Sequence, residues 1–240
     1  MIASDIKHYD FGNKHFESFL DPLMQYSCGM WDGADNLSHS QIIKLDYIDM
    51  VLQLDCNSKI LDLGCGWGGF SKHFKDYNID NVTVSHEQSK YCNARLCDWK
   101  NLNRVYDKIV CVGMLEHVRR VDYNQFFKKV SECLVTNGMM YLQFISSRKP
   151  LKSWTLDTMF PGSELGSLSE VIKVIEENEL SIVSIANDRE DYVKTLNAWC
   201  SNYIKNNENP NKDWIKYFKT CRKGFGIGLT DLYRVVIKND

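Results

Sequence analysis

The sequence has little proline, no marked excess of charge of either sign and no long apolar run. Its 240 residues include four prolines, and no repeat or low-complexity linker divides them, so we expect a single domain over 1–240. The formal net charge is −2, so no cationic field suggests a nucleic acid partner. No apolar stretch approaches the roughly 18 residues that a membrane span requires.

Metal-binding cysteine patterns are also missing. The nine cysteines include no CxxC pair with histidines at zinc spacing, so no metal site is predicted. The first residues, MIASDIKHYDFGNKHF, are polar and charged, unlike the apolar core of a signal peptide. The cysteine number is odd as well, so we expect reduced thiols and a cytoplasmic location.

Strands and helices alternate along most of the chain. Apolar runs predict strands over 59–63, 81–85, 106–113, 139–145, 181–186 and 231–238. Apolar residues at helical spacing predict helices over 69–77, 121–134, 168–178, 190–205 and 212–223. This alternation is typical of an α/β fold with a mostly parallel sheet and helices on both faces. We read the link before the last strand as loop-like and expect that strand to be antiparallel.

Two further helices are predicted before the first strand. Residues 13–24 and 40–54 both carry an apolar stripe at helical spacing. We interpret 1–55 as an N-terminal helical cap and 56–240 as the α/β core. The irregular stretch near 146–168 is interpreted as an insertion on the substrate side.

A glycine-rich turn follows the first strand. KILDL (59–63) leads directly into Gly64-Cys65-Gly66-Trp67-Gly68-Gly69. Glycine accepts a positive φ and lets backbone N–H groups approach a ligand closely, and the next helix begins at the same place. The spacing fits a nucleotide-like cofactor, and Asp62 could face the amino-acid end of that cofactor.

The polar groups after the second strand favour S-adenosylmethionine over a dinucleotide. The second strand ends in Thr-Val-Ser-His-Glu-Gln, without the acidic residue that usually holds a dinucleotide ribose. Ser85 and Gln88 are instead well placed, and Asp98 and Trp99 suit an adenine ring. Only nine residues separate Gln88 from Asp98. They are too few for a full helix and strand, so we expect a thin adenine wall.

Several separated segments resemble the cyclopropane fatty acid synthase family, which includes the mycolic acid cyclopropane synthases. The similar segments occur in the family's order at 8–31, 60–70, 83–88, 106–118, 159–170, 191–199 and 221–228. The resemblance implies a seven-stranded Rossmann-like class I methyltransferase sheet, with N-terminal helices covering the cofactor. It covers the catalytic domain alone and lacks the extra N-terminal domain of some bacterial members.

Cofactor and catalytic residues are implied by the same resemblance. Matching positions imply that S-adenosylmethionine is bound by Tyr26, Ser27, Gly64, Cys65, Gly66, Trp67, Gly68, Ser85, Gln88, Asp98 and Trp99. The family's bicarbonate site matches Cys28, Glu116 and Tyr192, but Gln143 stands where the family has His. Gln forms hydrogen bonds but does not titrate near neutral pH. Cys221 matches a cysteine once proposed as a nucleophile, and a packed thiol explains it equally well.

The implied reaction is cyclopropanation of an unsaturated fatty acyl chain. An aromatic face could stabilise the carbocation that follows attack on the activated methyl group, and the candidates are Tyr26, Trp31, Phe144 and Phe160. Bicarbonate held near Glu116 would then remove a proton to close the ring. The alternatives are N- or C-methyl transfer to a small metabolite, cofactor binding without turnover, and a nicotinamide-dependent dehydrogenase.

The expected acceptor is an unsaturated acyl lipid or a small molecule. Without a positive patch, contact with a membrane surface would need an exposed apolar helix face near 13–31. The sequence leaves open whether this face meets a membrane or is buried in a homodimer.

Overall fold

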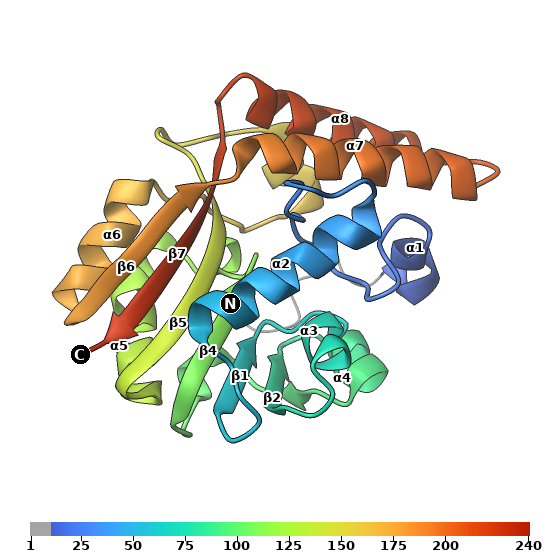
Figure 1. The fold of residues 1–240 in the computed structure, drawn as a ribbon. Helices are drawn as coiled ribbons and strands as arrows, with labels where there is room; N and C mark the ends of the chain where they lie inside the picture. Colours follow the sequence, from blue (N-terminus) through green and yellow to red (C-terminus); the bar gives the residue numbers. More distant parts are fainter. Residues whose placement is uncertain (1–10) are drawn as a thin grey trace.

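A seven-stranded mixed sheet forms the centre of the computed structural model, which describes residues 11–240 (Figure 1). The strand order is β3-β2-β1-β4-β5-β7-β6. The strands β3, β2, β1, β4 and β5 are parallel to one another, and β7 is antiparallel to both β5 and β6. The strands are β1 (Lys59–Leu63), β2 (Asn78–Thr83), β3 (Arg95–Leu96), β4 (Tyr106–Val112), β5 (Leu134–Ser146), β6 (Leu180–Asn187) and β7 (Asp231–Asn239). The expected seven-stranded Rossmann-like sheet is therefore confirmed.

Helices cover both faces of this sheet. On one face, α2 (Leu37–Leu52) and α3 (Gly69–His73) bury Leu45, Ile48 and Phe70 against the strands. On the other face, α5 (Tyr123–Cys133) and α6 (Leu168–Glu177) bury Phe127 and Ile175. Burial of apolar area at about 25 cal/mol per Å² is the main term that holds these layers together.

A helical hairpin joins β6 to β7, so the loop-like link expected before the last strand is wrong. The hairpin consists of α7 (Arg189–Asn206) and α8 (Lys212–Gly226), which run side by side across the top of the molecule in Figure 1. Trp199, Trp214 and Phe218 of this hairpin pack with Phe16 and Phe19 in a second aromatic core. Since two helices lie between the strands, the chain has room to return and place β7 antiparallel between β5 and β6.

The helix expected over 13–24 is wrong in its second half. Helix α1 covers only Asn13–Glu17. Pro22 lacks a backbone N–H and disfavours helical geometry at the residue before it. The Asp21 carboxylate instead accepts backbone N–H groups of Leu23 (3.0 Å) and Gln25 (2.8 Å). The chain therefore turns here and carries residues 24–28 toward the sheet.

Other boundaries shift by a few residues. Helix α2 begins three residues early, because the Asn36 side chain caps it by accepting the N–H of His39. Strand β2 also begins three residues early, and α3 ends at His73 rather than at residue 77. A single turn of π-helix, η6 (Thr155–Met159), lies in the segment interpreted as an insertion.

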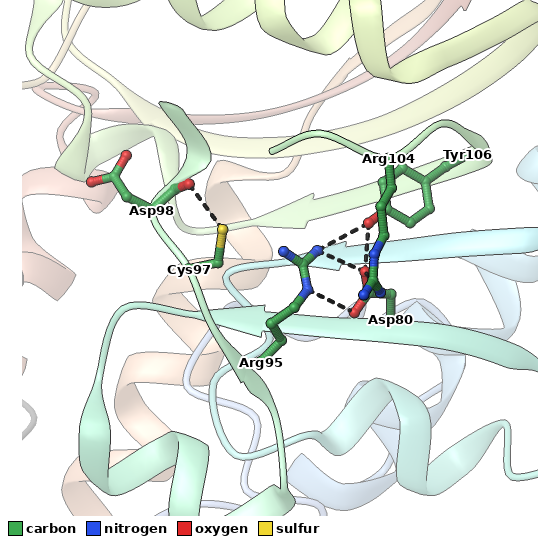
Figure 2. A network of polar contacts seen from close by, with 6 residues as sticks. All are labelled: Asp80, Arg95, Cys97, Asp98, Arg104 and Tyr106. Atoms are coloured by element: carbon green, nitrogen blue, oxygen red, sulfur yellow. Dashed lines mark hydrogen bonds and ion pairs between the residues drawn. The ribbon is translucent and has the colours of Figure 1, made fainter. Parts of the chain in front are cut away.

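The short crossover after β2 still supplies a helix and a strand. The helix α4 (His86–Cys92) has seven residues, and β3 has two. Figure 2 shows Asp80, a residue of β2, in contact with Arg95, Arg104 and Tyr106. Arg95 binds both carboxylate oxygens of Asp80, at 3.3 and 2.7 Å. This network ties the two-residue strand to β2, where backbone pairing alone is minimal.

Candidate functional site

A cavity of about 170 Å³ opens where β1, β2 and β4 end. The carboxyl ends of parallel strands are where ligands bind in open α/β sheets. This cavity, which we call the cofactor cavity, is lined by residues from α2, from the glycine turn and from the segment 24–28, which we call the first cap turn. Among the cofactor-binding candidates, those that line it are Tyr26, Ser27, Asp62, Gly64, Cys65, Gly66, Trp67, Gln88, Asp98 and Trp99.

The glycine turn has the backbone geometry that its sequence predicts. Gly64, Gly66 and Gly68 have φ of 83°, 54° and 74°, values that glycine adopts without steric cost. The N–H groups of Gly64 and Cys65 both donate to the carbonyl of Val82, at 2.9 and 3.0 Å. The turn is thus fixed to β2, and its open side faces the cofactor cavity.

Two buried ionisable groups of opposite sign, Asp62 and Lys44, line the cofactor cavity. Asp62, in β1, is 5% exposed, and its Oδ2 has no hydrogen-bond partner. Burial raises the pKa of Asp62 to about 7, although Lys44 opposes this shift. Lys44, from α2, is 1% exposed, and burial lowers its pKa to about 8. The sequence interpretation found Asp62 and missed Lys44.

The part of the cavity that the sequence interpretation assigns to adenine is lined by residues at the ends of β2 and β3. The Gln88 Oε1 accepts the Thr83 hydroxyl at 2.8 Å, which fixes the amide of Gln88. Asp98 caps the short helix η3 (Trp99–Asn101) by accepting the N–H of Lys100. The Trp99 ring is 7% exposed and packs edge-on against Phe126. A flat, rigid aromatic surface therefore stands beside a fixed carboxylate.

Two of the cofactor-binding candidates do not line the cofactor cavity. Ser85 is the N-cap of α4, and its hydroxyl accepts the N–H of Gln88 at 3.3 Å. Gly68 lies behind the turn, where a Cβ would approach the Cβ of Cys92 to 2.7 Å. The structure gives both residues a local role in shaping the turn and the helix that follows it.

A second cavity of about 150 Å³ lies beside the first, and we call it the acceptor cavity. All five catalytic candidates line it: Cys28, Glu116, Gln143, Tyr192 and Cys221. They come from the first cap turn, from the short helix η4 that follows β4, and from β5, α7 and α8. Residues up to 193 positions apart in the sequence, from Cys28 to Cys221, thus line one apolar cavity.

Glu116 and Gln143 are the polar centre of the acceptor cavity. Glu116 lies in the short helix η4 (Leu115–His117), and its Oε1 accepts the N–H of Ile145 at 2.7 Å. Its Oε2 and the Gln143 Nε2 are both buried without a hydrogen-bond partner. Burial raises the pKa of Glu116 to about 7. Unpaired buried polar atoms are costly, so this pair is suited to a ligand that both donates and accepts.

The other three candidates are neutral donors near pH 7. Burial raises the pKa of the Cys28 thiol and of the Tyr192 phenol well above their ordinary values. The Cys28 Sγ donates to the carbonyl of Gly29 at 3.1 Å. Burial also raises the pKa of Cys221 to about 12. Since the thiolate is the nucleophilic form, the environment of Cys221 suits a packed thiol better than a nucleophile.

Four residues line both cavities: Tyr26, Ser27, Gly113 and His117. His117 stands at this junction, with its Nδ1 3.3 Å from the Ser163 hydroxyl. Burial lowers the pKa of His117 to about 4, so it is neutral at physiological pH. Tyr217, which the sequence interpretation missed, accepts the Tyr26 hydroxyl at 2.9 Å and lines the acceptor cavity.

The aromatic candidates for a cation divide into two groups. Tyr26 and Phe160 line the acceptor cavity. Phe144 does not, because it belongs to the core on the α5 side of the sheet and packs with Tyr233. Trp31 also lies outside the lining, and its Nε1 donates to the Thr195 hydroxyl at 2.8 Å.

Within residues 11–240, no group of three or more His, Cys, Asp or Glu side chains could hold a metal ion. Across the same residues, none of the helices combines the length and the hydropathy that a bilayer crossing needs. The sequence left open whether the apolar face near 13–31 is exposed, and the structure buries its residues Phe16, Phe19, Leu20 and Met24. They pack against α7 and α8 rather than facing solvent.

Two proteins of known activity are similar to this chain in sequence. The chain is 34% identical to the cyclopropane-fatty-acyl-phospholipid synthase of Escherichia coli, over 96% of the chain and 66% of that protein. It is 27% identical to cyclopropane mycolic acid synthase 1 of Mycobacterium tuberculosis, over 94% and 93% of the two chains. The chain therefore spans about two thirds of the first relative and nearly all of the second.

Two solved structures share the fold closely. The cyclopropane synthase MmaA2 from Mycobacterium tuberculosis superposes with a TM-score of 0.91 at 23% identity, over 98% of each chain. The mycolic acid cyclopropane synthase CmaA1, complexed with SAH and CTAB, gives 0.91 at 24% identity, also over 98% of each chain. The profile described as "Mycolic acid cyclopropane synthetase" matches residues 2–235. The resemblance is thereby confirmed, and the chain belongs to the mycolic acid cyclopropane synthetase family, a group of S-adenosylmethionine-dependent methyltransferases.

Proposed function

We propose that this chain uses S-adenosylmethionine to add a methylene group to the double bond of an unsaturated fatty acyl chain. The observation that carries the proposal is the position of Glu116 and Gln143. Their unpaired Oε2 and Nε2 atoms are buried in an apolar cavity that adjoins the cofactor cavity through Tyr26, Ser27, Gly113 and His117. An acyl chain needs apolar walls, and ring closure needs a base beside the new carbon.

The cofactor cavity fits an S-adenosylmethionine molecule by its chemistry. Asp62 offers an unpaired buried carboxylate oxygen to an ammonium group. Trp99 offers a ring face to adenine, and Asp98 offers a carboxylate to its amino group. When bound, this cofactor supplies a methyl group activated by a sulfonium. The chain then has to align the acceptor with that methyl group and to exclude water.

The acceptor cavity has aromatic residues that suit a developing cation. Tyr26, Phe160 and Tyr217 line it, and a ring face attracts a cation by up to about 2 kcal/mol in a desolvated site. If the alkene attacks the methyl carbon, the bond between that carbon and the sulfonium sulfur would break, S-adenosylhomocysteine would leave with the electron pair of that bond, and one alkene carbon would be electron-deficient. Loss of a proton from the transferred carbon lets the C–H electron pair close the ring.

Bicarbonate fits as the base for this proton. It has one O–H to donate and two oxygens to accept, and the cavity offers a complementary set. Glu116 Oε2 would accept the bicarbonate O–H, while Gln143 Nε2–H and the Tyr192 hydroxyl would donate to its oxygens. Gln143 stays a neutral donor at every pH. Gln in place of the family's His therefore keeps the hydrogen bond, but the side chain at this position no longer changes its charge with pH.

The acceptor would reach the cavity from an anionic phospholipid surface. Leu229 lines the acceptor cavity, and Ile227 and Leu229 are 67% and 49% exposed. The Ser147 hydroxyl contacts the carbonyls of both Lys149 and Leu229, so this apolar tip lies beside a basic segment. Arg148, Lys149 and Lys152 are exposed there, and basic side chains next to apolar ones favour anionic bilayers.

The proposal is tested with purified chain, S-adenosylmethionine, bicarbonate and vesicles of unsaturated phospholipid. Mass spectrometry of the released acyl chains should show the added mass of one CH2 group and the loss of the double bond. Methylation confined to small water-soluble amines would replace the proposal with the N-methyltransferase alternative. An absence of S-adenosylmethionine consumption with every acceptor would leave only a binding protein.

The membrane contact has its own test. Sedimentation with anionic vesicles should decrease several-fold for Ile227→Ser, while Val183→Ser, which alters an exposed apolar residue of β6, serves as the matched control. Equal sedimentation of the two variants would contradict a contact through residues 227–229.

A further inference from the structure

Lys44 is a buried cation in the middle of α2. It is 1% exposed and lines the cofactor cavity together with Leu45 and Ile48. Lysine is almost never fully buried unless it has a charged partner. No ion pair of the described residues involves Lys44, so its position calls for another explanation.

The hydrogen bonds of Lys44 connect α2 to the first cap turn. Its Nζ donates to the Ser27 Oγ at 2.7 Å and to the Gln41 Oε1 at 2.6 Å. The Gln41 Nε2 in turn donates to the carbonyl of Ser27 at 2.8 Å. An ammonium carries three N–H groups, and among residues 11–240 only these two acceptors are found for Lys44. One donor therefore stays available at the cavity wall.

Asp62 presents the opposite charge in the same cavity. Its Oδ2 is buried and unpaired, and no hydrogen bond or ion pair joins it to Lys44 among the described residues. Two buried charges that do not pair with each other are each left incompletely compensated. A zwitterion between them would compensate both, with its ammonium at Asp62 and its carboxylate at Lys44.

We propose that Lys44 is a cofactor-binding residue that takes the α-carboxylate of the methionine moiety of S-adenosylmethionine. The inference rests on the proposed function, since it assumes that this cofactor occupies the cavity. Asp62 takes the α-ammonium in the same arrangement. By holding Ser27 through both its hydroxyl and, via Gln41, its carbonyl, Lys44 also couples the carboxylate to a residue that lines the acceptor cavity.

The electrostatic state of Lys44 supports this role. Burial lowers its pKa to about 8, and Asp21, Cys28 and Asp62 oppose the shift. At pH 7 most of the population therefore carries the charge that a carboxylate requires. Hydrogen bonds between charged groups are stronger than neutral ones, so removing the ammonium should weaken binding of a carboxylate selectively.

Calorimetric titration with three ligands tests the proposal. S-adenosylhomocysteine carries both charged groups, S-adenosyl-3-thiopropylamine lacks only the carboxylate, and 5′-methylthioadenosine lacks both. Lys44→Met should weaken S-adenosylhomocysteine binding by about 10- to 100-fold and S-adenosyl-3-thiopropylamine binding by less than about threefold. Lys90→Met, at an exposed position of α4, is the matched control and should change neither.

A purely structural role of Lys44 predicts a different pattern. If Lys44 only holds Ser27, then Lys44→Met and Gln41→Met would weaken all three ligands by similar factors, and the inference would be overturned. Under the inference, Gln41→Met keeps the preference for the carboxylate-bearing ligand that the unmodified chain shows.

The unmodified chain provides a test that does not depend on folding of a variant. It should bind S-adenosylhomocysteine at least about tenfold more tightly than S-adenosyl-3-thiopropylamine. Equal affinities would overturn the role of Lys44 while leaving the proposed cofactor intact. Binding of none of the three ligands would instead overturn the proposed function itself, and with it this inference.

Discussion

Glu116 and Ile145 are joined by a hydrogen bond of 2.7 Å from the backbone N–H of Ile145 to Oε1 of Glu116. This bond connects the short helix η4, which follows β4, to the end of β5 and fixes the orientation of the carboxylate. The second oxygen, Oε2, is then held inside the acceptor cavity without a partner. One backbone contact thus fixes the Glu116 side chain, and Oε2 is free to accept a hydrogen bond from a ligand.

Glu116→Gln should abolish most product formation while keeping the fold and the cofactor affinity. The amide retains the acceptor oxygen for Ile145 but offers no anionic oxygen to a bicarbonate O–H. General acid–base groups contribute typically about 10²- to 10⁴-fold, so we expect a loss in kcat of about 100-fold or more. Chromatography of cyclopropane acyl esters measures it. Glu176→Gln, on the exposed side of α6, is the control.

Turnover should rise with pH around neutrality. The pKa of Glu116 is raised by burial to about 7, and the proposed role needs the ionised carboxylate. Below pH 7 the protonated acid therefore lowers the rate, and the rate should level off about one pH unit above this value. Initial rates at saturating cofactor and bicarbonate measure the profile. A rate independent of pH between 6 and 8 would speak against an ionised Glu116.

Asp62→Asn should stabilise the chain at pH 8 and weaken the cofactor. Burial raises the pKa of Asp62 to about 7, above its unfolded value, so the folded chain binds more protons between about pH 4 and 7. The stability that this group contributes is present below pH 4 and is lost as pH rises through 7. Removing the charge should therefore add on the order of 1–3 kcal/mol at pH 8.

Urea unfolding at pH 8 and pH 4.5 measures this effect, since the gain should shrink at the lower pH. Calorimetry with S-adenosylhomocysteine on the same variant should show weaker binding. A variant that is both destabilised at pH 8 and unchanged in affinity would contradict the assignment of Asp62.

Local sequence patterns predicted the parallel core well. The strand over 59–63 is found as β1 without change, because an apolar run before a glycine turn has few alternative structures. The turn itself has positive φ at Gly64, Gly66 and Gly68. The five catalytic candidates, taken from motifs far apart in sequence, line one cavity. Motif order therefore carried information about position that no single segment contained.

Non-local contacts explain what the sequence interpretation missed. The buried stripe of α2 includes Ser40, Gln41 and Lys44, whereas Ile42 and Ile43, which belong to the apolar residues over 40–54, are only partly buried. A lysine on a buried stripe becomes intelligible only when Ser27 and the cavity are seen beside it. The hairpin of α7 and α8 was likewise predicted as two helices, but its role as the link between β6 and β7 depends on strand pairing.

Asp80→Ala should destabilise the chain more than Arg104→Ala does. Asp80 accepts hydrogen bonds from Arg95, Arg104 and Tyr106 (Figure 2). Its loss leaves partly buried donors unpaired, which costs about 1–3 kcal/mol. Arg104 has a side chain that is 60% exposed, and an exposed ion pair contributes about 0–1 kcal/mol. Urea unfolding compares the two variants, and equal losses would show that β3 does not depend on this network.

Gly64→Ala and Gly66→Ala should separate folding from binding. Both glycines have positive φ, so alanine is strained by about 1–2 kcal/mol at each position. A Cβ on Gly64 would also lie 2.9 Å from the Met114 Cγ, whereas a Cβ on Gly66 would meet nothing within 4 Å. Gly64→Ala should therefore lose more stability than the backbone strain alone explains.

The open space beside Gly66 is part of the cofactor cavity. The methyl group of an alanine at position 66 would therefore occupy volume that the cofactor needs. We expect Gly66→Ala to lose about 1 kcal/mol in urea unfolding and to weaken S-adenosylhomocysteine at least about tenfold, the loss that corresponds to 1.4 kcal/mol of binding. If Gly66→Ala bound as tightly as the unmodified chain, the cofactor could not lie against this turn. Because Asp62 and Lys44 line the same cavity as Gly66, a Gly66→Ala variant with unchanged affinity would also contradict the proposed contacts of these two residues with the cofactor.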